Sequence, residues 1–463
     1  MLKPVWSIGT VAQRVAVSVS VICLVFVTAA SVAAVGDSPR VQQQHVFSRD
    51  GASVVSVIPM AGPGAEVLVG QPTEAHGGSP ELSAPTWTQM TCPSGLYLHA
   101  VSMGSPLVGF AAGELGVVLR TIDGGNTWQY ALNQGFPYYY YGVQAFNANT
   151  VFITGFNNST GAGVFRWSDD GGNTWGPVVS LTAPTALSWL FVTKFSDANH
   201  GMIQGFGGGV WYTTTGGRTT ADWHFTQPTV NWWQGTFTLL PDGRAWMTGY
   251  DDWRSTNFGA AWTQIPNADP VFDGPNHFLP DGHGFIGGGS ISPAVAGWLY
   301  ASTNGGDSWT SSPVLSAAYP VRAILRSTDL RGWAVGGNVY TNVGGVWGTT
   351  DGGTTWTPEQ EVGAELQDIA WVRVNATQMD VYAVGMISQI WRARVAAPPL
   401  LGDLNCDGVV NFGDINPFVL ALVGQDAYEA AFPNCVWLNA DINGDGTVNF
   451  GDINPFVALL AAQ

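Results

Sequence analysis

The sequence predicts two kinds of structure in one chain: an all-β seven-bladed β-propeller and, after it, a small α-helical domain with paired EF-hand-like calcium loops. Composition is the first observation, because the 463 residues include 60 Gly and 21 Trp while only 11% are charged, which is typical of turn-rich, aromatic sheet proteins. The second observation is a motif that recurs through the middle of the chain. The third is an Asp- and Asn-rich segment that occurs twice near the C-terminus.

An eight-residue motif that ends in Trp marks one hairpin of each repeat, and we call it the box. Its third position is Asp or Asn in most copies, where the side chain accepts hydrogen bonds from turn amides, and the paired glycines that follow allow positive φ. Successive copies start 42 to 47 residues apart, which is the length of one four-stranded propeller blade. The copies start at Thr121, Ser168, Thr213 (with an insertion), Ser255 (a worn copy), Ser302 and Thr349.

A second motif, a large apolar residue followed by two residues and Gly, outnumbers the box by one. Its copies begin at Phe110, Phe152, Met202, Trp246, Phe285, Trp333 and Tyr382. The last repeat lacks a fourth strand, whereas Pro85–Met90 resembles the strand that follows a box without having a box before it. We therefore expect this N-terminal segment to complete the last blade and close a ring of seven, because closure removes exposed sheet edges.

The box resembles the Asp-box (BNR-like) repeat of bacterial sialidases, sortilin-type receptors and xyloglucan-degrading enzymes. The longer pattern is most similar to propellers of the photosystem II assembly-factor type. This resemblance covers residues 86–395 and implies a fold rather than an activity, because one propeller fold hosts many functions. It also implies that the box aspartates Asp123, Asp170 and Asp351 are structural, so a ligand would bind at the opposite face or in the central channel.

Loops between the second and third strands of the blades supply the candidate ligand-binding residues. They are the carboxylates Glu114, Asp251 and Asp252 and the aromatic residues Tyr250 and Trp253. Two carboxylates that flank a sugar bond suffice for glycoside hydrolysis, and the aromatic rings could stack on sugars. Part of the tyrosine run at 138–141 is expected to reach the same face. The alternative is that these acids are solvated loop residues, and the sequence leaves open whether the propeller is an enzyme.

Two twelve-residue loops near the C-terminus have the pattern of calcium-binding loops. They cover 403–414 and 441–452, and each places Asp, Asn, Asp and Asn at positions 1, 3, 5 and 9, Gly at 6 and Asp at 12. Oxygen ligands at alternating positions around a Gly turn suit Ca²⁺, a hard cation that takes about six to eight oxygens. Each loop continues into a helical segment that begins with the same five residues, INPFV.

The paired loops resemble a type I dockerin over residues 402–463, which implies two bound Ca²⁺ ions and a cohesin-like protein or cell-surface component as partner. The implied ligands are Asp403, Asn405, Asp407, Val409 (through its carbonyl), Asn411 and Asp414 for one ion, and Asp441, Asn443, Asp445, Thr447 (through its carbonyl), Asn449 and Asp452 for the other. Cellulosomal dockerins often carry Ser-Thr at the two positions before the twelfth, where they contact cohesin. This chain has Phe412-Gly413 and Phe450-Gly451 there, which are either symmetric partner contacts or loop packing.

Three cysteines, Cys92, Cys406 and Cys435, lie after the N-terminal residues 1–34. Cys406 lies inside the first loop and Cys435 just before the second, and we predict a disulfide between them that closes a loop of about thirty residues. Two free thiols are the alternative. Cys92 would then remain as a small buried apolar residue.

Export is predicted from the N-terminus. Residues 1–34 read as a signal peptide, because Lys3 and Arg14 precede an apolar run that ends in small residues, although an uncleaved membrane anchor is the alternative. Residues 35–85 read as a flexible segment and 396–401 as a linker. The net charge of −17 argues against nucleic acid or an anionic membrane as partner, and we expect no membrane insertion after cleavage.

Three functional hypotheses follow. The first is a secreted or cell-surface calcium-binding protein whose non-catalytic propeller binds a glycan or protein and whose dockerin-like module attaches it to a partner. The second is an extracellular glycoside hydrolase that acts in polysaccharide catabolism. In the third, the C-terminal module is a folding staple, which means that it only stabilises the fold and binds no partner.

Overall fold

The computed structural model describes residues 85–461, apart from 184–188, 230–233, 250, 266–272, 291–295, 312–319, 329, 339–340, 376, 399, 408, 434 and 444. The predicted signal peptide, nearly all of the predicted flexible segment and Tyr250 lie outside the described residues.

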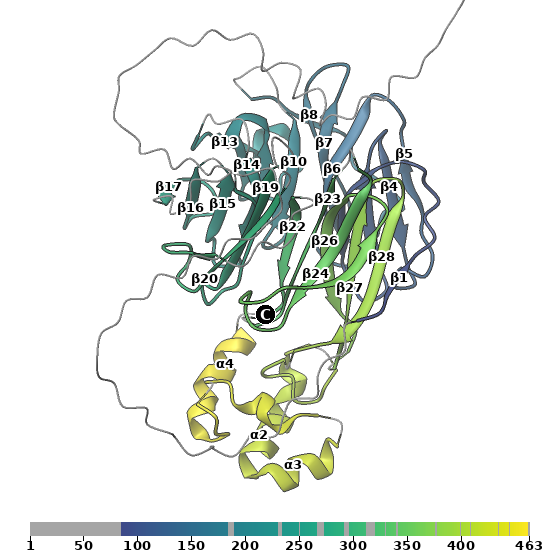
Figure 1. The fold of residues 1–463 in the computed structure, drawn as a ribbon. Helices are drawn as coiled ribbons and strands as arrows, with labels where there is room; N and C mark the ends of the chain where they lie inside the picture. The colour runs from purple at the N-terminus through teal and green to yellow at the C-terminus, as the bar shows by residue number, and fades with distance from the viewer. Residues whose placement is uncertain are drawn as a thin grey trace, which may run out of the picture. The chain divides into compact units, whose positions relative to one another are not determined.

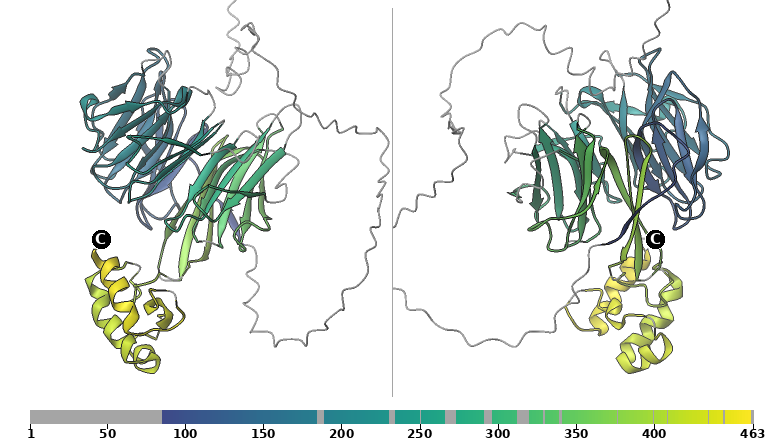
Figure 2. Two further views of the ribbon diagram at one scale, coloured as in Figure 1. Left: turned by 90° about the vertical axis from the view of Figure 1, so that its left-hand side faces the viewer. Right: turned by 45° about the vertical axis from the view of Figure 1, so that its right-hand side comes forward.

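Seven four-stranded antiparallel sheets form the propeller that the repeats predict (Figures 1 and 2). In blades 1 to 6 the strands follow one another along the chain, and the first strands of adjoining blades pack against each other around the centre of the ring. Blade 1 consists of β2 (Leu98–Met103), β3 (Gly109–Gly113), β4 (Val117–Thr121) and β5 (Gln129–Asn133); blade 2 of β6 (Tyr138–Ala145), β7 (Val151–Asn157), β8 (Gly163–Ser168) and β9 (Val179–Leu181); blade 3 of β10 (Leu190–Phe195), β11 (Gly201–Gly205), β12 (Val210–Thr213) and β13 (His224–Thr226).

The next three blades repeat this order, and two short 3-10 helices, η2 (Phe206–Gly208) and η3 (Thr220–Asp222), lie in blade 3. Blade 4 consists of β14 (Gln234–Leu239), β15 (Ala245–Gly249), β16 (Asp252–Ser255) and β17 (Thr263–Ile265); blade 5 of β18 (Asp273–Phe278), β19 (Gly284–Ser290), β20 (Ala296–Ser302) and β21 (Thr310–Ser311); blade 6 of β22 (Val321–Arg326), β23 (Gly332–Asn338), β24 (Val343–Thr349) and β25 (Thr357–Val362).

Blade 7 is closed by the N-terminal strand, as the missing fourth strand of the last repeat predicts. It contains β26 (Leu366–Arg373), β27 (Gln378–Gly385), β28 (Gln389–Ala396) and, outermost, β1 (Trp87–Gln89). Strand β1 runs antiparallel to β28, with Trp87 opposite Ala393. The two ends of the propeller are therefore joined in one sheet.

The two repeated motifs contact each other across the boundaries between blades. In three boundaries an aromatic ring lies on the second glycine of the next blade's box, and these pairs are Tyr382 with Gly125, Phe110 with Gly172 and Phe285 with Gly353. A Cβ on each of these glycines would lie 2.7 Å from the Cε1 atom of the ring. The glycines also have positive φ, between 82° and 93°, so a side chain there would meet both backbone strain and a ring.

The boundary from blade 6 to blade 7 has no box, and a buried carboxylate replaces it. Glu359 of β25 accepts hydrogen bonds from the indole Nε1–H groups of Trp333 at 3.2 Å and of Trp87 at 3.1 Å. The Arg331 guanidinium donates to the other carboxylate oxygen at 2.8 Å and stacks on the Trp333 ring. One carboxylate thus holds Trp333, which begins the sixth copy of the second motif, and the closing strand together.

Polar side chains of the inner strands satisfy the open edge of the neighbouring blade. At four boundaries the side chain of the penultimate residue of one inner strand accepts a hydrogen bond from the backbone N–H of the last residue of the next inner strand. The pairs, acceptor first, are Ser102 and Ala145, Gln144 and Phe195, Thr238 and Phe278, and His277 and Arg326. These bonds matter because an inner strand has no further strand to pair with on its channel side, and buried backbone N–H groups need acceptors.

The C-terminal module contains two similar loop–helix halves. The 3-10 turn η4 (Phe412–Asp414) continues into α2 (Ile415–Val423), and η6 (Phe450–Asp452) continues into α4 (Ile453–Ala461); α3 (Gln425–Ala431) and η5 (Trp437–Ala440) lie between them. The rings of Phe418 and Phe456 stack at 4.2 Å in the small core between the halves. In the part of the chain that the structure describes, no helix has the length and apolar character needed to span a membrane.

Candidate functional sites

The carboxylates of the boxes are engaged within their own turns. Asp170 accepts hydrogen bonds from the Thr174 hydroxyl at 2.6 Å, from the Thr174 N–H at 2.8 Å and from the Ser168 hydroxyl at 2.7 Å. These bonds, the one from the Thr174 hydroxyl most of all, lower the pKa of Asp170 to about 2. The carboxylate of each Asp box is therefore a turn-stabilising group rather than a free ligand-binding acid.

The candidate carboxylates of the strand 2–3 loops lie in two different blades. Glu114 follows β3 in blade 1, whereas Asp251 and Asp252 lie at the start of β16 in blade 4. Asp251 accepts a hydrogen bond from the Thr229 hydroxyl at 3.2 Å. Asp252 is only 2% exposed, so its carboxylate faces the interior of the blade.

Trp253 has a partly buried position. Its side chain packs against an apolar cluster formed by residues of blades 3 and 4, including Met202, Phe237 and Met247. The structure thus brings Asp251, Asp252 and Trp253 together at one strand end and places Glu114 in a separate blade.

Glu114 of blade 1 lies beside a group of aromatic side chains from blades 2 and 3. Burial raises the pKa of the Glu114 carboxyl, and burial followed by the Glu114 charge raises the pKa of the Tyr139 hydroxyl in blade 2. Among the described residues, no side-chain hydrogen bond or ion pair is made by the Glu114 carboxylate. A half-buried acid without a partner next to aromatic rings is typical of a binding site rather than a structural ion pair.

We call this group the aromatic mouth; it consists of Tyr139, Tyr141, Phe156, Trp189, Phe191 and Phe206. Its residues lie in or directly beside the starts of β6 and β10 and the ends of β7 and β11, so they gather at the face that carries the strand 2–3 loops. Ring centroids lie 5.2 Å apart for Tyr139 and Phe156, and 4.7 Å apart for Phe156 and Trp189. Tyr141 also stacks on His99 of blade 1 at 4.2 Å.

Only part of the aromatic mouth is predicted by the sequence. The sequence predicts part of the tyrosine run at 138–141 on this face, but it does not single out Trp189 and Phe206. Their signal was present, because Trp189 directly precedes an inner strand and Phe206 directly follows the Gly of the second motif. Five of the six residues remain partly exposed, Phe156 being buried, so the group offers ring faces to a ligand.

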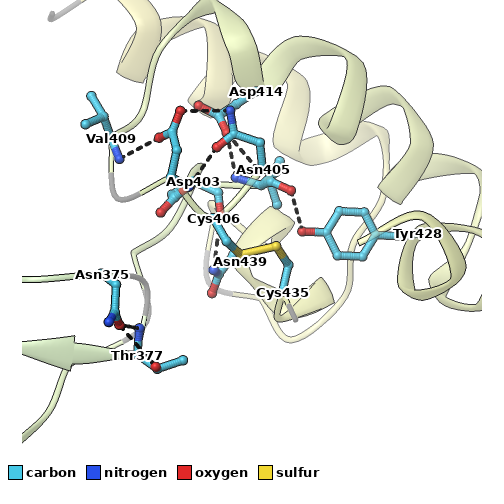
Figure 3. Close-up of a disulfide and its surroundings, with 12 residues drawn as sticks. Asn375, Thr377, Asp403, Asn405, Cys406, Val409, Asp414, Tyr428, Cys435 and Asn439 are labelled. Atoms are coloured by element: carbon cyan, nitrogen blue, oxygen red, sulfur yellow. Dashed lines mark hydrogen bonds between the residues drawn. A yellow bond between two sulfur atoms is a disulfide. The ribbon is translucent and has the colours of Figure 1, made fainter. Parts of the chain in front are cut away.

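The two C-terminal loops close around their last carboxylate in the same way. Asp414 accepts from the N–H groups of Leu404 at 2.7 Å, Asn405 at 3.0 Å and Asn411 at 2.8 Å (Figure 3). Asp452 accepts from the N–H groups of Ile442, Asn443 and Asn449 at 2.8, 3.0 and 2.9 Å. The repeated sequence therefore builds one loop geometry twice.

The charge balance of this module shows what the loops could hold. Asp403, Asp414 and Asp452 are fully buried, yet residues 402–463 contain no Lys, Arg or His. The charge of Arg373 in β26 acts on Asp403, whereas Asp414 and Asp452 accept backbone N–H groups. Buried carboxylates are costly unless they are paired, and the side-chain oxygens at positions 1, 3, 5, 9 and 12 suit a hard cation. Among the described residues no three His, Cys, Asp or Glu side chains are grouped as a metal site, so amide and carbonyl oxygens would have to complete the coordination.

A disulfide links the first loop to the segment before the second. Cys406 and Cys435 are bonded, with Cα atoms 5.8 Å apart (Figure 3). Cys406 has positive φ (59°), and Tyr428 donates a hydrogen bond to the Leu404 carbonyl at 2.8 Å. Burial, with the charges of Asp403 and Asp414, raises the pKa of Tyr428 to about 12. The first loop is therefore fixed by two contacts besides its own carboxylate. Cys92 is a free, partly buried thiol.

Phe412 and Phe450 each begin an exposed apolar stripe; we call the two copies the paired stripes. The first consists of Phe412, Ile415 and Val419, and the second of Phe450, Ile453 and Val457. Their exposed fractions are 77%, 39% and 55% in the first and 78%, 38% and 56% in the second. The spacing i, i+3, i+7 puts each set along one helical side. Phe412 and Phe450 are too exposed to serve as loop packing.

Comparison with known proteins supports the propeller fold. No protein-family model matches the chain, and no curated protein matches it in sequence. Among solved structures, the chain is similar to YCF48 bound to D1 peptide, with 17% identity, a TM-score of 0.51 and coverage of 66% of this chain and 96% of that one. YCF48 from Cyanidioschyzon merolae has 17% identity and a TM-score of 0.50, with coverage of 66% of this chain and 98% of that one. The GH74 enzyme of Niastella koreensis has 16% identity and a TM-score of 0.50, with coverage of 66% of this chain and 53% of that one.

These neighbours share the propeller fold with this chain, but they do not all have the same function. In one of these structures YCF48 is bound to a D1 peptide, whereas the GH74 protein is an enzyme. At such low identity the likeness shows the propeller fold alone. Function has to be argued from the residues of this chain.

Proposed function

We propose that the protein is a secreted calcium-binding protein that attaches through its C-terminal dockerin-like module to a cohesin-like protein or another cell-surface component, while its propeller binds a glycan or protein. The observation that carries the proposal is the near-identical exposure of the paired stripes. Large apolar side chains exposed in duplicate mark an interaction surface. The aromatic mouth supports the second part, because aromatic rings with a nearby polar group bind sugar faces and peptide side chains.

Calcium would organise both loops. Asp403, Asn405, Asp407, Asn411 and Asp414, with the Val409 carbonyl, would hold one ion, and the equivalent residues from Asp441 to Asp452, with the Thr447 carbonyl, would hold the other. Bound Ca²⁺ would neutralise carboxylates that no cation of the module neutralises, and it would fix the helices that carry the paired stripes.

Calorimetric titration of the full chain with CaCl2 tests this step. We expect about two ions per chain and a thermal unfolding temperature that falls when a chelator is added. Asp414→Ala should remove one ion, whereas Asp426→Asn, a change of an exposed acid outside both loops, should leave both. A chain that takes up no Ca²⁺ would exclude the calcium proposal.

Partner binding is tested with a panel of immobilised cohesin domains. If either stripe can dock, Phe412→Asp and Phe450→Asp should each cost about twofold in affinity, as the loss of one of two equivalent sites, and the double variant should lose binding. Leu438→Asp, at an exposed apolar residue outside the stripes, is the matched control. A double variant that binds like the wild type would place attachment elsewhere, and binding to none of the cohesins would leave the folding-staple hypothesis.

Ligand binding by the propeller is tested on glycan and peptide arrays. Stacking of a sugar or side chain on the aromatic mouth predicts that Tyr139→Ala weakens binding about tenfold, since a stacked ring contributes on the order of 1 kcal/mol or more. Tyr130→Ala, which removes an exposed tyrosine from the outer strand β5, should have no effect. Equal losses in both variants would argue against the aromatic mouth.

The second candidate function is glycoside hydrolysis, and Glu114 is the observation that favours it. A carboxyl whose pKa is raised by burial is suited to act as a general acid near neutral pH. Release of reducing sugar from plant and microbial polysaccharides would detect this activity. Glu114→Gln should then abolish it and Glu361→Gln, at an exposed glutamate of β25, should not; absence of release from every polysaccharide leaves the binding function.

A further inference from the structure

Lys194 occupies an unusual position on the inner wall of the propeller. After Lys3 it is the only lysine in the sequence, and it lies in β10, the inner strand of blade 3. Its side chain is exposed, although β10 packs between the inner strands of blades 2 and 4. The charge of Lys194 acts on His277 in blade 5 and on Asp368 in blade 7. An exposed side chain that acts on two other inner strands lies in the central channel.

Lys194 also breaks the hydrogen-bond pattern of the inner strands. It is the penultimate residue of its strand, the position at which Ser102, Gln144, Thr238 and His277 accept an N–H from the next blade. An ammonium group has donors only and cannot accept. By the pattern of the other blades, the residue at this position would accept the N–H of Leu239, the last residue of β14 in blade 4. No acceptor for the Leu239 N–H is found among the described residues.

His277 adds a third donor at the same level of the channel. Its Nδ1 accepts the Arg326 N–H at 3.3 Å, so in the neutral ring the proton lies on Nε2. Burial, then the charges of Lys194 and Arg326, lower the pKa of His277 to about 3, which keeps the ring neutral. In the part of the chain that is described, no acceptor faces Nε2.

The surrounding charges favour a monoanion. The Arg326 side chain is buried, packs over the Phe285 ring and donates to the Thr328 carbonyl, so we do not count it as a donor of the site, although its charge acts on His277. Asp368 of blade 7 accepts the Val101 N–H at 2.9 Å, and burial raises its pKa. One ammonium and two neutral donors opposite a carboxyl suit a singly charged oxyanion better than a phosphate dianion.

We propose that the central channel, at the end nearer the boxes, binds a carboxylate through the Lys194 ammonium, the Leu239 N–H and the His277 Nε2–H. The carboxylate would come from an acidic sugar or from an acidic peptide side chain. This site is independent of the calcium loops and of the aromatic mouth, which lies at the other end of the inner strands.

Lys194 is the only lysine among the described residues, which makes the site directly observable. Reductive ¹³C-dimethylation keeps the charge of Lys194 and gives it a ¹H–¹³C signal, which the Lys194→Gln variant identifies against Lys3 and the α-amine. We expect this signal of the full chain to shift saturably with sodium galacturonate or N-acetylglutamate. Saturation by galacturonate alone identifies an acidic sugar, and by N-acetylglutamate alone an acidic side chain. A shift that is linear and equal to that caused by sodium chloride, for both probes, would overturn the proposal.

Affinity measurements on unlabelled variants separate a binding role from a structural one. Lys194→Gln should weaken binding of the active probe about tenfold or more, because it removes a charge-assisted hydrogen bond. Asp368→Asn should strengthen binding, since it removes a negative charge that acts on Lys194. Arg244→Gln, at a surface arginine paired with Asp242, should bind normally. Equal affinity of Lys194→Gln and wild type would contradict the assignment.

Discussion

Blades 1 to 6 and blade 7 solve the same packing problem in different ways. Between most blades, a large apolar residue of one blade contacts the box of the next, as Phe110 contacts Gly172. Blade 7 has no box, and Trp333 is held instead by Glu359, which also binds Trp87 of the closing strand. The difference teaches that the two repeated motifs are halves of one contact, and that its loss at the closing blade requires a buried polar replacement.

Removal of Glu359 should have the largest effect on stability. Glu359→Ala leaves two buried indole N–H groups without their acceptor and the Arg331 guanidinium with only the Thr349 carbonyl. Breaking such a buried network costs about 3–5 kcal/mol. Urea unfolding of the full chain measures this loss. Glu361→Ala, two residues along the same strand and exposed, should change the free energy of unfolding by less than about 0.5 kcal/mol. A similar small change in Glu359→Ala would mean that Glu359 does not replace the missing box.

Filling a box glycine should have an intermediate effect. Gly172→Ala introduces a Cβ at a positive φ of 85° and 2.7 Å from Phe110 Cε1, which should cost about 2–4 kcal/mol from backbone strain and overpacking together. Gly161→Ala is the matched control, because Gly161 also has positive φ (70°) but no neighbour within 4 Å of the added Cβ. It should cost only about 1 kcal/mol. Equal losses would show that the ring contact contributes nothing.

Acid should weaken the boxes that contain Asp, and this is the smallest effect. The pKa of Asp170 is lowered from 3.8 to about 2 in the folded protein. A lowered folded pKa means that the stabilisation is present above the unfolded pKa and is lost as the pH falls from about 4 to about 2. Asp170→Asn should therefore flatten the fall of the unfolding temperature over this range. The boxes of blades 4 and 5 carry Asn257 and Asn304, so Asn304→Ala should leave the pH dependence unchanged.

The repeats predicted the blades well because each blade is a local structure. Box spacing located the hairpins, and the surplus copy of the second motif pointed to closure by Pro85–Met90. The contact that secures closure was not predictable, because Glu359 and Trp87 are 272 residues apart and nothing in either local sequence names the other. The same limit applies to the inner strands, whose penultimate side chains act on a different blade.

Site residues were predicted less completely than blades. A loop position was expected for Asp251 and Asp252 alike, but β16 begins at Asp252, and the strand turns its carboxylate inward. Trp189 and Phe206 join the aromatic mouth only because adjoining blades bring the start of β10 and the end of β11 beside β7. In the C-terminal module, the duplicated decapeptide already indicated duplicated geometry, and the structure adds that Phe412 and Phe450 face solvent.

Closure by β1 gives the folding of this chain a fixed order of events. Trp87 is among the first described residues to be synthesised, yet its partners are Ala393 across the sheet and Glu359 in blade 6. The first strand must therefore remain unpaired until nearly the whole propeller has emerged. Long-range pairing of this kind is slow, and an unpaired strand can pair with a strand of another chain. Before β1 pairs with β28, the open ring is therefore the state in which the chain is most exposed to aggregation.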